Sequence, residues 1–333
     1  MAGQAGETRP VRLGLACTGW IAEWAVHQPI RDGSPATVAF VASRDPARAR
    51  AYAAERAIPA SGAWPDLLDR PDVDAVYVAT PNAGHLRLAL EAVRAGKHVL
   101  CEKPLGHDPG AVAELCAEAR RRRVLVREAY HYRAHPALAG VLAALRGGAV
   151  GEVRRVEVHY GWPLERADDV RLSAELDGGA LMDVGCYGLD LVRRLTPALP
   201  EVTGVRARTG PTGVDLTAEV RLRSGPVRAR VWASLRSPAF VCDARVTGTE
   251  GSLGLSSPFL PVLPGPEATR LFRARWGPGT RAPAPREGPF TSYRYQLDAF
   301  ARDVAAGEYG AGEGIADQAR LLGQVRERMR GAR

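Results

Sequence analysis

The stretch Val99–Pro104, VLCEKP, decides how the rest of the chain is interpreted. It is a short apolar run that ends abruptly in an acid, a base and a proline. A buried parallel strand with this ending delivers Glu102 and Lys103 to the carboxyl edge of a sheet, where open α/β sheets bind their ligands. We therefore expect a ligand to lie against this edge, and the neighbouring sequence indicates which one.

The chain opens with the pattern of a nucleotide-binding unit. The apolar run 11–16 is followed directly by a helix-opening turn made of Cys17, Thr18, Gly19, Trp20, Ile21 and Ala22. This spacing matches the dinucleotide fingerprint G-x-G-x-x-G/A, except that Cys17 stands in place of the first glycine. Gly19 lets the backbone approach a pyrophosphate, and the helix N-terminus offers it N–H groups. Residues 17–21 are therefore candidate cofactor contacts, although a coincidental turn of small residues is the alternative.

The end of the second apolar run, 37–42, indicates which dinucleotide binds. In folds that prefer NAD an acid here binds the ribose 2′-hydroxyl, but Ser43 and Arg44 occupy this place. A hydroxyl and a guanidinium suit a 2′-phosphate, because arginine forms charge-assisted hydrogen bonds with phosphate oxygens. Asp45 is interpreted as a helix N-cap, since Pro46 follows it at the first helical position. We expect NADP(H) to be preferred over NAD(H).

Strands and helices alternate through the rest of the first half. Strands are predicted at 74–79, 99–101 and 124–126, with helices at 83–95 and 108–122 between them. This alternation predicts a doubly wound parallel sheet, a Rossmann-type α/β domain over residues 1–128. Further candidate contacts to the cofactor follow these strands, namely Thr80, Pro81, Asn82, His85, Glu102 and Lys103.

Three segments together resemble one family. They are GWIA at 19–22, ASRD at 42–45 and, above all, GKHVLCEKP at 96–104. The segments are similar to those of the glucose–fructose oxidoreductase / inositol dehydrogenase (Gfo/Idh/MocA) family, and the resemblance covers nearly the whole chain. It implies a nicotinamide-dependent oxidoreductase in which Lys103 faces the nicotinamide.

The second half, residues 129–333, predicts a separate α+β domain. Stretches at 153–158, 216–222 and 227–235 alternate apolar and polar residues, as half-buried strands of a large, open, mostly antiparallel sheet do. The proline-rich residues 256–289 are predicted to be extended or looped, and helices are expected at 292–306 and 315–329. The family resemblance implies a homodimer or homotetramer formed through the open sheet.

The candidate chemistry of this domain lies in GGALMDVGCYGLD, residues 178–190. A helix that opens after the paired glycines places Asp183 and Tyr187 on one face. A buried helix in which Tyr187 only fills space is the structural alternative. The family, however, carries Asp, three residues, then His or Tyr in this setting, and these residues form its reaction site with the lysine of EKP. Tyr187 in place of His resembles the branch of glucose–fructose oxidoreductase, dimeric dihydrodiol dehydrogenase and keto-sugar reductases.

Ketone reduction needs a hydride and a proton for the developing alkoxide. Tyr187 is assigned as general acid/base, although the free pKa of tyrosine, about 10, is high for neutral pH. We expect the Lys103 ammonium to lower that pKa and to polarise the carbonyl. Asp183 either binds a substrate hydroxyl or holds Lys103 in place. Whether Lys103 or Tyr187 transfers the proton directly stays open.

Four other residues have competing interpretations. Arg171 resembles a family arginine near cofactor or substrate, and a solvated loop charge is the alternative. Arg133 is a further candidate to reach the cofactor. His131 and His135 are four residues apart, but Pro136 and the lack of a third ligand argue against a metal pair, so packing or surface roles are expected. No metal site is predicted.

The composition excludes other classes of protein. The chain has 333 residues, a formal charge of +8 and 46% hydrophobic residues, which is ordinary for a globular protein. No apolar run approaches the roughly 18 residues of a membrane span, and the opening residues lack the core of a secretory signal. No nucleic-acid-binding module is recognisable. We expect a cytoplasmic protein that binds neither membrane nor nucleic acid, with five reduced, mostly buried cysteines.

These patterns predict an NADP(H)-dependent oxidoreductase for a carbonyl or secondary alcohol of a pyranose-type sugar, with nucleotide-linked keto-deoxysugars among the candidate substrates. One alternative is an enzyme for a non-sugar cyclic carbonyl or a dihydrodiol, whose pocket would be lined by aromatic side chains. Another is a non-catalytic NADP(H)-binding regulator. The intact set of Lys103, Asp183 and Tyr187 argues against the regulator.

Overall fold

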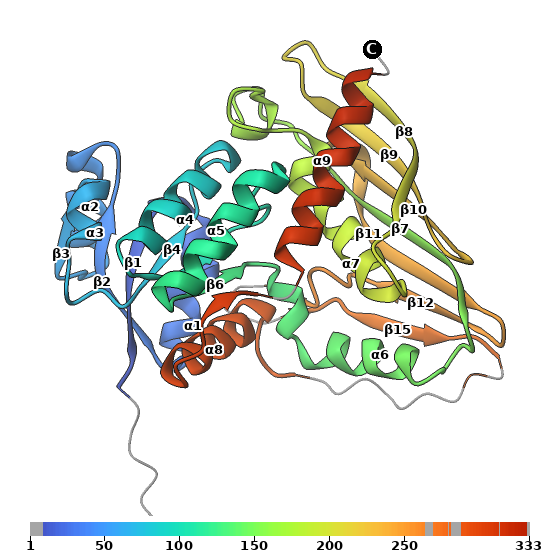
Figure 1. Cartoon of the computed structure of the whole chain (residues 1–333), viewed down its shortest axis with the longest axis horizontal. Coiled ribbons are helices and arrows are strands. Elements are labelled where there is room, and N and C mark those ends of the chain that lie inside the picture. The colour runs from blue at the N-terminus through green and yellow to red at the C-terminus, as the bar shows by residue number, and fades with distance from the viewer. Residues whose placement is uncertain (1–8, 264–268, 279, 281–287, 313, 332–333) are drawn as a thin grey trace, which may run out of the picture.

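The computed structural model describes residues 9–263, 269–278, 280, 288–312 and 314–331. Two large sheets lie next to each other, and helices separate them (Figure 1). The described part of the chain contains no helix with the length and apolar character needed to cross a membrane. All five cysteines are buried and free, as predicted.

The first sheet has seven strands in the order β16-β6-β5-β4-β1-β2-β3. Their bounds are β1 Val11–Ala16, β2 Ala36–Ala42, β3 Ala60–Gly62, β4 Ala75–Val78, β5 His98–Cys101, β6 Leu125–Glu128 and β16 Gly310–Ala311. Every neighbouring pair is parallel. The order β3-β2-β1-β4-β5-β6 is that of dinucleotide-binding folds, so the predicted doubly wound sheet is confirmed.

Helices cover both faces of this sheet, because its strands are apolar on both sides. One core lies under α3 Trp64–Leu68, α4 His85–Arg94 and α5 Pro109–Arg122. The other lies under η1 Glu23–His27, α1 Gln28–Arg31, α2 Pro46–Glu55 and α8 Ser292–Ala305. The Asp45 carboxylate accepts the N–H of Ala47 at 2.8 Å, and Asp108 caps α5 in the same way through Gly110. Both predicted N-caps are therefore present.

The C-terminal part of the chain returns to the first sheet. α8 packs against β1 and β6, and β16 pairs with β6 in parallel, with Gly310 opposite Leu125. Residues 292–311 thus lie with the first sheet, although they fall within the second half of the chain. The division into residues 1–128 and 129–333 stays a prediction.

The second sheet has the order β15-β12-β11-β7-β10-β9-β8. Its strands are β7 Val153–Pro163, β8 Glu201–Thr209, β9 Asp215–Ser224, β10 Val227–Ser234, β11 Arg236–Gly248, β12 Ser252–Ser256 and β15 Arg273–Trp276. Neighbours are antiparallel except β7 and β10. The predicted antiparallel sheet is confirmed, and the three alternating stretches lie in β7, β9 and β10.

One face of the second sheet packs against helices. These are α6 Pro136–Arg146, α7 Cys186–Leu195 with the preceding π-helical turn η5 Leu181–Gly185, and α9 Ile315–Gly331. α9 also packs against α5, so it runs between the two sheets (Figure 1). The other face exposes arginines such as Arg155, Arg228 and Arg230.

The proline-rich region contains the short pair β13 Val262–Leu263 and β14 Thr269–Arg270. The rest of its predicted extended stretch, at 264–268, 279 and 281–287, lies outside the described residues. The expected helix at 292–306 is α8, and the one at 315–329 is α9.

Candidate active site

The carboxyl edge of the first sheet collects four predicted segments. β2, β1, β4 and β5 are consecutive parallel neighbours, so the segments that follow them emerge at one edge in that order. These segments are residues 43–45, 17–21, 80–82 and 102–104. Ligands of open α/β sheets lie along such an edge, and the arrangement fits an elongated dinucleotide.

The turn after β1 is shaped for a close approach. A Cβ placed on Gly19 would meet no atom within 4 Å, so the backbone there faces open space. The helical segment begins at Ile21. Cys17 is buried and Trp20 is 58% exposed, while Thr18, Gly19 and Ile21 lie between these extremes. An open backbone at the start of a helix fits a pyrophosphate group.

The segment after β2 presents a cation. Arg44 is exposed, and within the described ranges no ion pair engages its guanidinium. The Ser43 hydroxyl accepts the N–H of Asp45 at 3.2 Å, and the Asp45 carboxylate caps α2. Because this acid is engaged in the helix, the exposed guanidinium and the hydroxyl remain for the ligand. They fit the 2′-phosphate of NADP(H).

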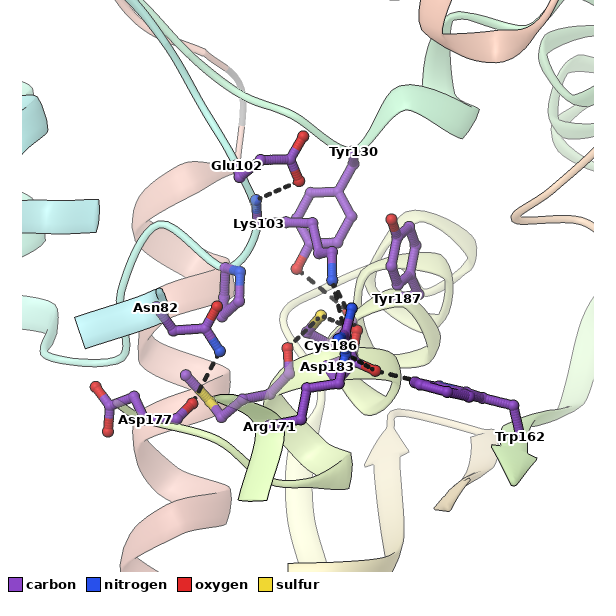
Figure 2. Close-up of polar contacts among 12 residues, drawn as sticks. Asn82, Glu102, Lys103, Tyr130, Trp162, Arg171, Asp177, Asp183, Cys186 and Tyr187 are labelled. Carbon is purple, nitrogen blue, oxygen red and sulfur yellow. Dashed lines mark hydrogen bonds and ion pairs between the residues drawn. The ribbon is translucent and has the colours of Figure 1, made fainter. Parts of the chain in front are cut away.

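A buried histidine joins the loops after β4 and β5. His85 is 1% exposed, and its ring nitrogens lie 2.7 Å from Thr80 O and 2.9 Å from Pro104 O. The sequence suggested a direct cofactor contact, but this burial places His85 between the loops, where it fixes their spacing. Pro81 is half-buried, and Asn82 donates to the backbone oxygen of Asp177 at 2.8 Å (Figure 2).

Glu102 and Lys103 serve different surroundings. Glu102 is buried, accepts the hydroxyl of Tyr77 at 2.8 Å, and has its pKa raised by burial. Lys103 reaches toward the second half of the chain, where Nζ donates to Asp183 O at 2.9 Å and lies 3.5 Å from Asp183 Oδ1 (Figure 2). The same ammonium is 5.0 Å from the centre of the Tyr187 ring. The structure therefore brings the three candidate catalytic residues together.

Three side chains hold the Asp183 carboxylate. Oδ2 lies 3.2 Å from Trp162 Nε1 and 3.1 Å from Arg171 Nε, while Lys103 approaches Oδ1. Burial alone would raise the pKa of Asp183, but Lys103, Arg171 and the Trp162 N–H outweigh it and hold that pKa below its ordinary value. The ionised carboxylate tethers Lys103, and its side chain keeps 13% exposure.

Tyr187 differs from the expectation in its acidity. It is 5% exposed, and the rings of Tyr130, Tyr160 and Phe259 have their centroids between 5.2 and 5.6 Å from its own. Burial raises its pKa well above the ordinary value, so the predicted lowering by Lys103 is wrong for this arrangement. The reason is geometric, because the ammonium lies over the ring face while the hydroxyl is 3.1 Å from His131 Nε2.

Sequence reasoning missed two residues at this site. His131, expected in a packing or surface role, is buried and contacts the Tyr187 hydroxyl. Its signal was its position just beyond β6, the strand next to β5 at the same sheet edge. Trp162, which holds Asp183, shares the parity of the buried residues Val158 and Tyr160 on β7, so the alternation of that strand was its signal.

Arg133 and His135 lie elsewhere. Arg133, considered for the cofactor, forms an ion pair with Asp190 at 2.6 Å and stacks 4.2 Å above the Tyr130 ring. The carboxylate on α7 captures it, which corrects that expectation. His135 caps α6, where its Nδ1 accepts the N–H of Ala137 at 3.3 Å.

The fold and the site define a class, that of dinucleotide-binding oxidoreductases with a second, sheet-containing half. A family model described as an oxidoreductase family with an NAD-binding Rossmann fold matches residues 11–130, and a GFO/IDH/MocA C-terminal domain model matches residues 139–254. The chain belongs to this GFO/IDH/MocA family of oxidoreductases. The resemblance seen in the sequence is confirmed.

Two curated relatives share one description, dTDP-3,4-didehydro-2,6-dideoxy-alpha-D-glucose 3-reductase. The protein from Streptomyces violaceoruber is 37% identical over 265 residues, which cover 78% of this chain and 77% of that protein. The protein from Saccharopolyspora spinosa is 32% identical over 96% of this chain and 98% of its own.

A similar solved structure is that of KijD10, a 3-ketoreductase from Actinomadura kijaniata, in complex with NADP and TDP-benzene. It is 27% identical, has a TM-score of 0.81, and the match covers 96% of this chain and 97% of that one. Variants of that protein in which a lysine is replaced by alanine, or a tyrosine by phenylalanine, have also been solved.

Proposed function

We propose that this protein is an NADP(H)-dependent oxidoreductase that moves a hydride between the nicotinamide and a carbonyl or secondary alcohol of a pyranose-type sugar. The meeting of Lys103, Asp183 and Tyr187 beside the carboxyl edge of the first sheet carries this proposal. The proposed substrate is a nucleotide-linked keto-deoxysugar, because two relatives are described as reductases of a dTDP-linked didehydro-dideoxyglucose.

The cofactor-binding residues of the proposal follow the strand order. Residues 17–21 would receive the pyrophosphate, Ser43 and Arg44 the 2′-phosphate, and residues 80–82 the segment that leads toward Lys103. When bound, the nicotinamide supplies or accepts the hydride. Arg171 contacts Asp169 at 3.1 Å as well as Asp183, so we assign it to the substrate side of the site.

Tyr187 and Lys103 divide the proton chemistry. In the direction of reduction the carbonyl oxygen gains negative charge, which the Lys103 ammonium stabilises. The raised pKa of Tyr187 keeps its hydroxyl protonated at neutral pH, so the hydroxyl donates its proton to the alkoxide, the stronger base. Asp183, held ionised, accepts a hydrogen bond from a sugar hydroxyl and keeps Lys103 in position.

A kinetic assay tests this function. The purified protein is mixed with NADPH and keto-sugars, with and without a linked nucleotide, and loss of the reduced-nicotinamide absorbance is followed. Tyr187→Phe should lower kcat by about 10²- to 10⁴-fold while NADPH still binds. Tyr309→Phe, an exposed tyrosine, is the matched control. Lack of turnover with every keto-sugar, or wild-type rates in Tyr187→Phe, would contradict the proposal.

One observation favours a second function, reduction of a non-sugar cyclic carbonyl or oxidation of a dihydrodiol. Aromatic rings, those of Tyr130, Tyr132, Tyr160 and Phe259, surround Tyr187. These rings are at most 8% exposed, whereas the polar side chains of Lys103, Asp183 and Arg171 are 13–24% exposed. A larger kcat/KM for a trans-dihydrodiol or cyclic diketone than for any sugar would favour the second function.

The open face of the second sheet is proposed to join two or four copies of the chain. Its support is the family resemblance together with a wide, solvent-facing surface that includes Arg155, Arg228 and Arg230. Light scattering coupled to size-exclusion chromatography measures the mass in solution. A monomer across the working concentration range would contradict the assembly without touching the proposed chemistry.

A further inference from the structure

A buried chain of three polar groups begins at the Tyr187 hydroxyl. Its oxygen is 3.1 Å from His131 Nε2, and His131 Nδ1 is 2.7 Å from the Ser292 hydroxyl oxygen. The three side chains come from α7, from the 3-10 turn η3 (His131–Ala134) and from the first turn of α8. They are 5%, 1% and 0% exposed, so they are shielded from bulk water.

Packing fixes the position of the His131 ring. It stacks on the Tyr293 ring with centroids 3.9 Å apart and 22° between planes, and it meets the Tyr187 ring edge-on at 5.9 Å. Ser292 is the first residue of α8, whose N-cap Thr291 accepts the N–H of Arg294 at 3.3 Å. The hydrogen-bonded chain is therefore anchored in three separate elements.

The imidazole of His131 is neutral at working pH. Burial lowers its pKa to about 3, and the positive charge of Lys103 adds to this effect. A neutral imidazole carries one N–H, so one ring nitrogen donates and the other accepts. The tautomer therefore sets the direction of both hydrogen bonds.

Ser292 selects the tautomer. Within the described part of the chain, the imidazole is the one hydrogen-bond partner of the Ser292 hydroxyl. If Nδ1 carried the proton, Ser292 would accept it and would bury its own O–H without an acceptor, which costs free energy. If Nε2 carries the proton, the Ser292 O–H donates to Nδ1 and the Nε2–H donates to the Tyr187 oxygen. The Tyr187 O–H then stays available for another acceptor.

We propose that Ser292 and His131 are positioning residues for the acid Tyr187: Ser292 holds His131 in the Nε2–H tautomer, and that N–H orients the Tyr187 oxygen and stabilises its phenolate form. The inference rests on the proposed function, in which Tyr187 gives the proton. As the substrate carbon gains the hydride, the Tyr187 O–H bond breaks and an O–H bond forms on the substrate oxygen. The negative charge left on Tyr187 accepts the Nε2–H hydrogen bond, and water returns a proton after product leaves.

This device acts against the burial of Tyr187, which by itself disfavours the phenolate. Titratable groups face Tyr187 from every element packed around it, namely Glu102, Lys103, Tyr130, His131, Tyr132, Tyr160, Cys186 and Tyr293. Of these groups, His131 is the one whose hydrogen bond to the Tyr187 hydroxyl the structure shows.

Paired substitutions test the role of His131. His131→Leu should lower kcat by about 10- to 100-fold, with little change in the dissociation constant of NADPH. In the direction of alcohol oxidation, the rise of kcat/KM with pH should move to higher pH, because the phenolate becomes harder to form. His131→Gln, whose amide N–H replaces the donor, should recover most of the rate. Equal losses in His131→Leu and His131→Gln, with an unshifted pH profile, would overturn the role.

A double-mutant cycle separates a positioning role from general damage. In a Tyr187→Phe background, His131→Leu should cause no further loss of kcat, because its effect passes through the Tyr187 oxygen. Independent, multiplying losses would overturn the inference. If His131→Leu does not fold, Ser292→Ala and Ser292→Thr carry the test, since only threonine keeps the hydroxyl, and equal kcat values in the two would overturn it.

The outcomes also separate this inference from the function on which it rests. An inactive wild-type protein, or an unimpaired Tyr187→Phe, contradicts the proposed function. An impaired Tyr187→Phe together with an unimpaired His131→Leu contradicts the positioning role alone.

Discussion

Asp183 and Asp190 stand two helical turns apart on the same segment, and both carboxylates lie among cations, yet their surroundings differ in kind. Asp190 is fully buried and accepts from the Tyr132 hydroxyl at 2.5 Å. Arginines 133, 193 and 194 lie between 2.6 and 3.2 Å from its oxygens. Burial would raise the pKa of Asp190, but these arginines outweigh it and hold the pKa far below its ordinary value.

The cluster around Asp183 is less complete and contains a lysine. Lys103 lies 3.5 Å from the carboxylate, and the side chain of Asp183 keeps 13% exposure. Of the 45 lysine and arginine residues, only those at positions 97 and 103 are lysines, and Lys97 donates to the buried backbone oxygen of Val73. Arginine stays charged in proteins, whereas the ammonium of lysine titrates when its surroundings change. The saturated arginine cluster supports the fold, and the lysine cluster retains groups that can meet a substrate.

Lys103→Ala tests the chemical side of this contrast with the largest expected effect. Without the ammonium, the developing alkoxide loses its counter-charge and Asp183 loses its partner. We expect kcat/KM to fall by about 10²- to 10⁴-fold while NADPH still binds, measured by steady-state kinetics and nicotinamide fluorescence. Arg328→Ala, an exposed cation on α9, is the control. A rate close to wild type in Lys103→Ala would remove the contrast.

Asp190→Asn tests the structural side. It leaves three arginines around a neutral amide in a buried site, and breaking a buried ion pair costs about 3–5 kcal/mol of unfolding free energy. Asp183→Asn should cost clearly less, because Asp183 is partly exposed, and should instead lower kcat/KM. Denaturant unfolding and kinetics on both variants make the measurement. Equal losses of stability would show that the two clusters do not differ in role.

Arg44→Ala has a smaller and more selective expected effect. Loss of the charge-assisted contact to a 2′-phosphate should weaken NADPH binding by about tenfold or more and leave NADH binding nearly unchanged. Arg48→Ala, one turn further along α2, is the matched control. Titration of both cofactors into each variant measures the ratio, and equal weakening of NADPH and NADH would refute the assignment of Arg44.

The pH dependence of stability gives the smallest effect. Since the folded pKa of Asp190 lies below the unfolded value of about 3.9, its contribution is fully present above that value and is lost as the pH falls below about 4. The unfolding free energy of wild type should therefore decrease at acid pH, and Asp190→Asn should show a shallower decrease. Parallel curves for the two proteins would contradict the depressed pKa.

Local patterns predicted much of the first sheet and its helices. α2 and α5 begin at Pro46 and Pro109 as expected, because an aspartate cap followed by proline is a signal contained within a few residues. The meeting of Lys103 with Asp183 and Tyr187 was predicted from the family resemblance, since nothing local connects residues 80 positions apart.

The features that were missed depend on distant parts of the chain. β16 has two residues, too few for any periodicity. The partners of His131 are 56 and 161 positions away, so no spacing reveals them. Arg133 was misassigned because its destination, Asp190, lies 57 positions along the chain. The acidity of Tyr187 depends on burial among rings from several elements, which a sequence pattern does not show.

The late return of α8 and β16 has a consequence for how the molecule is made. A ribosome releases these elements only after the whole second sheet, so until then β6 is an open edge and the apolar surface that receives Leu297 and Phe300 is bare. A shortened gene product that stops after α5 and β6 would keep that edge and surface permanently. The nucleotide-binding part is therefore not a detachable module, and its last strand is supplied by the tail of the chain.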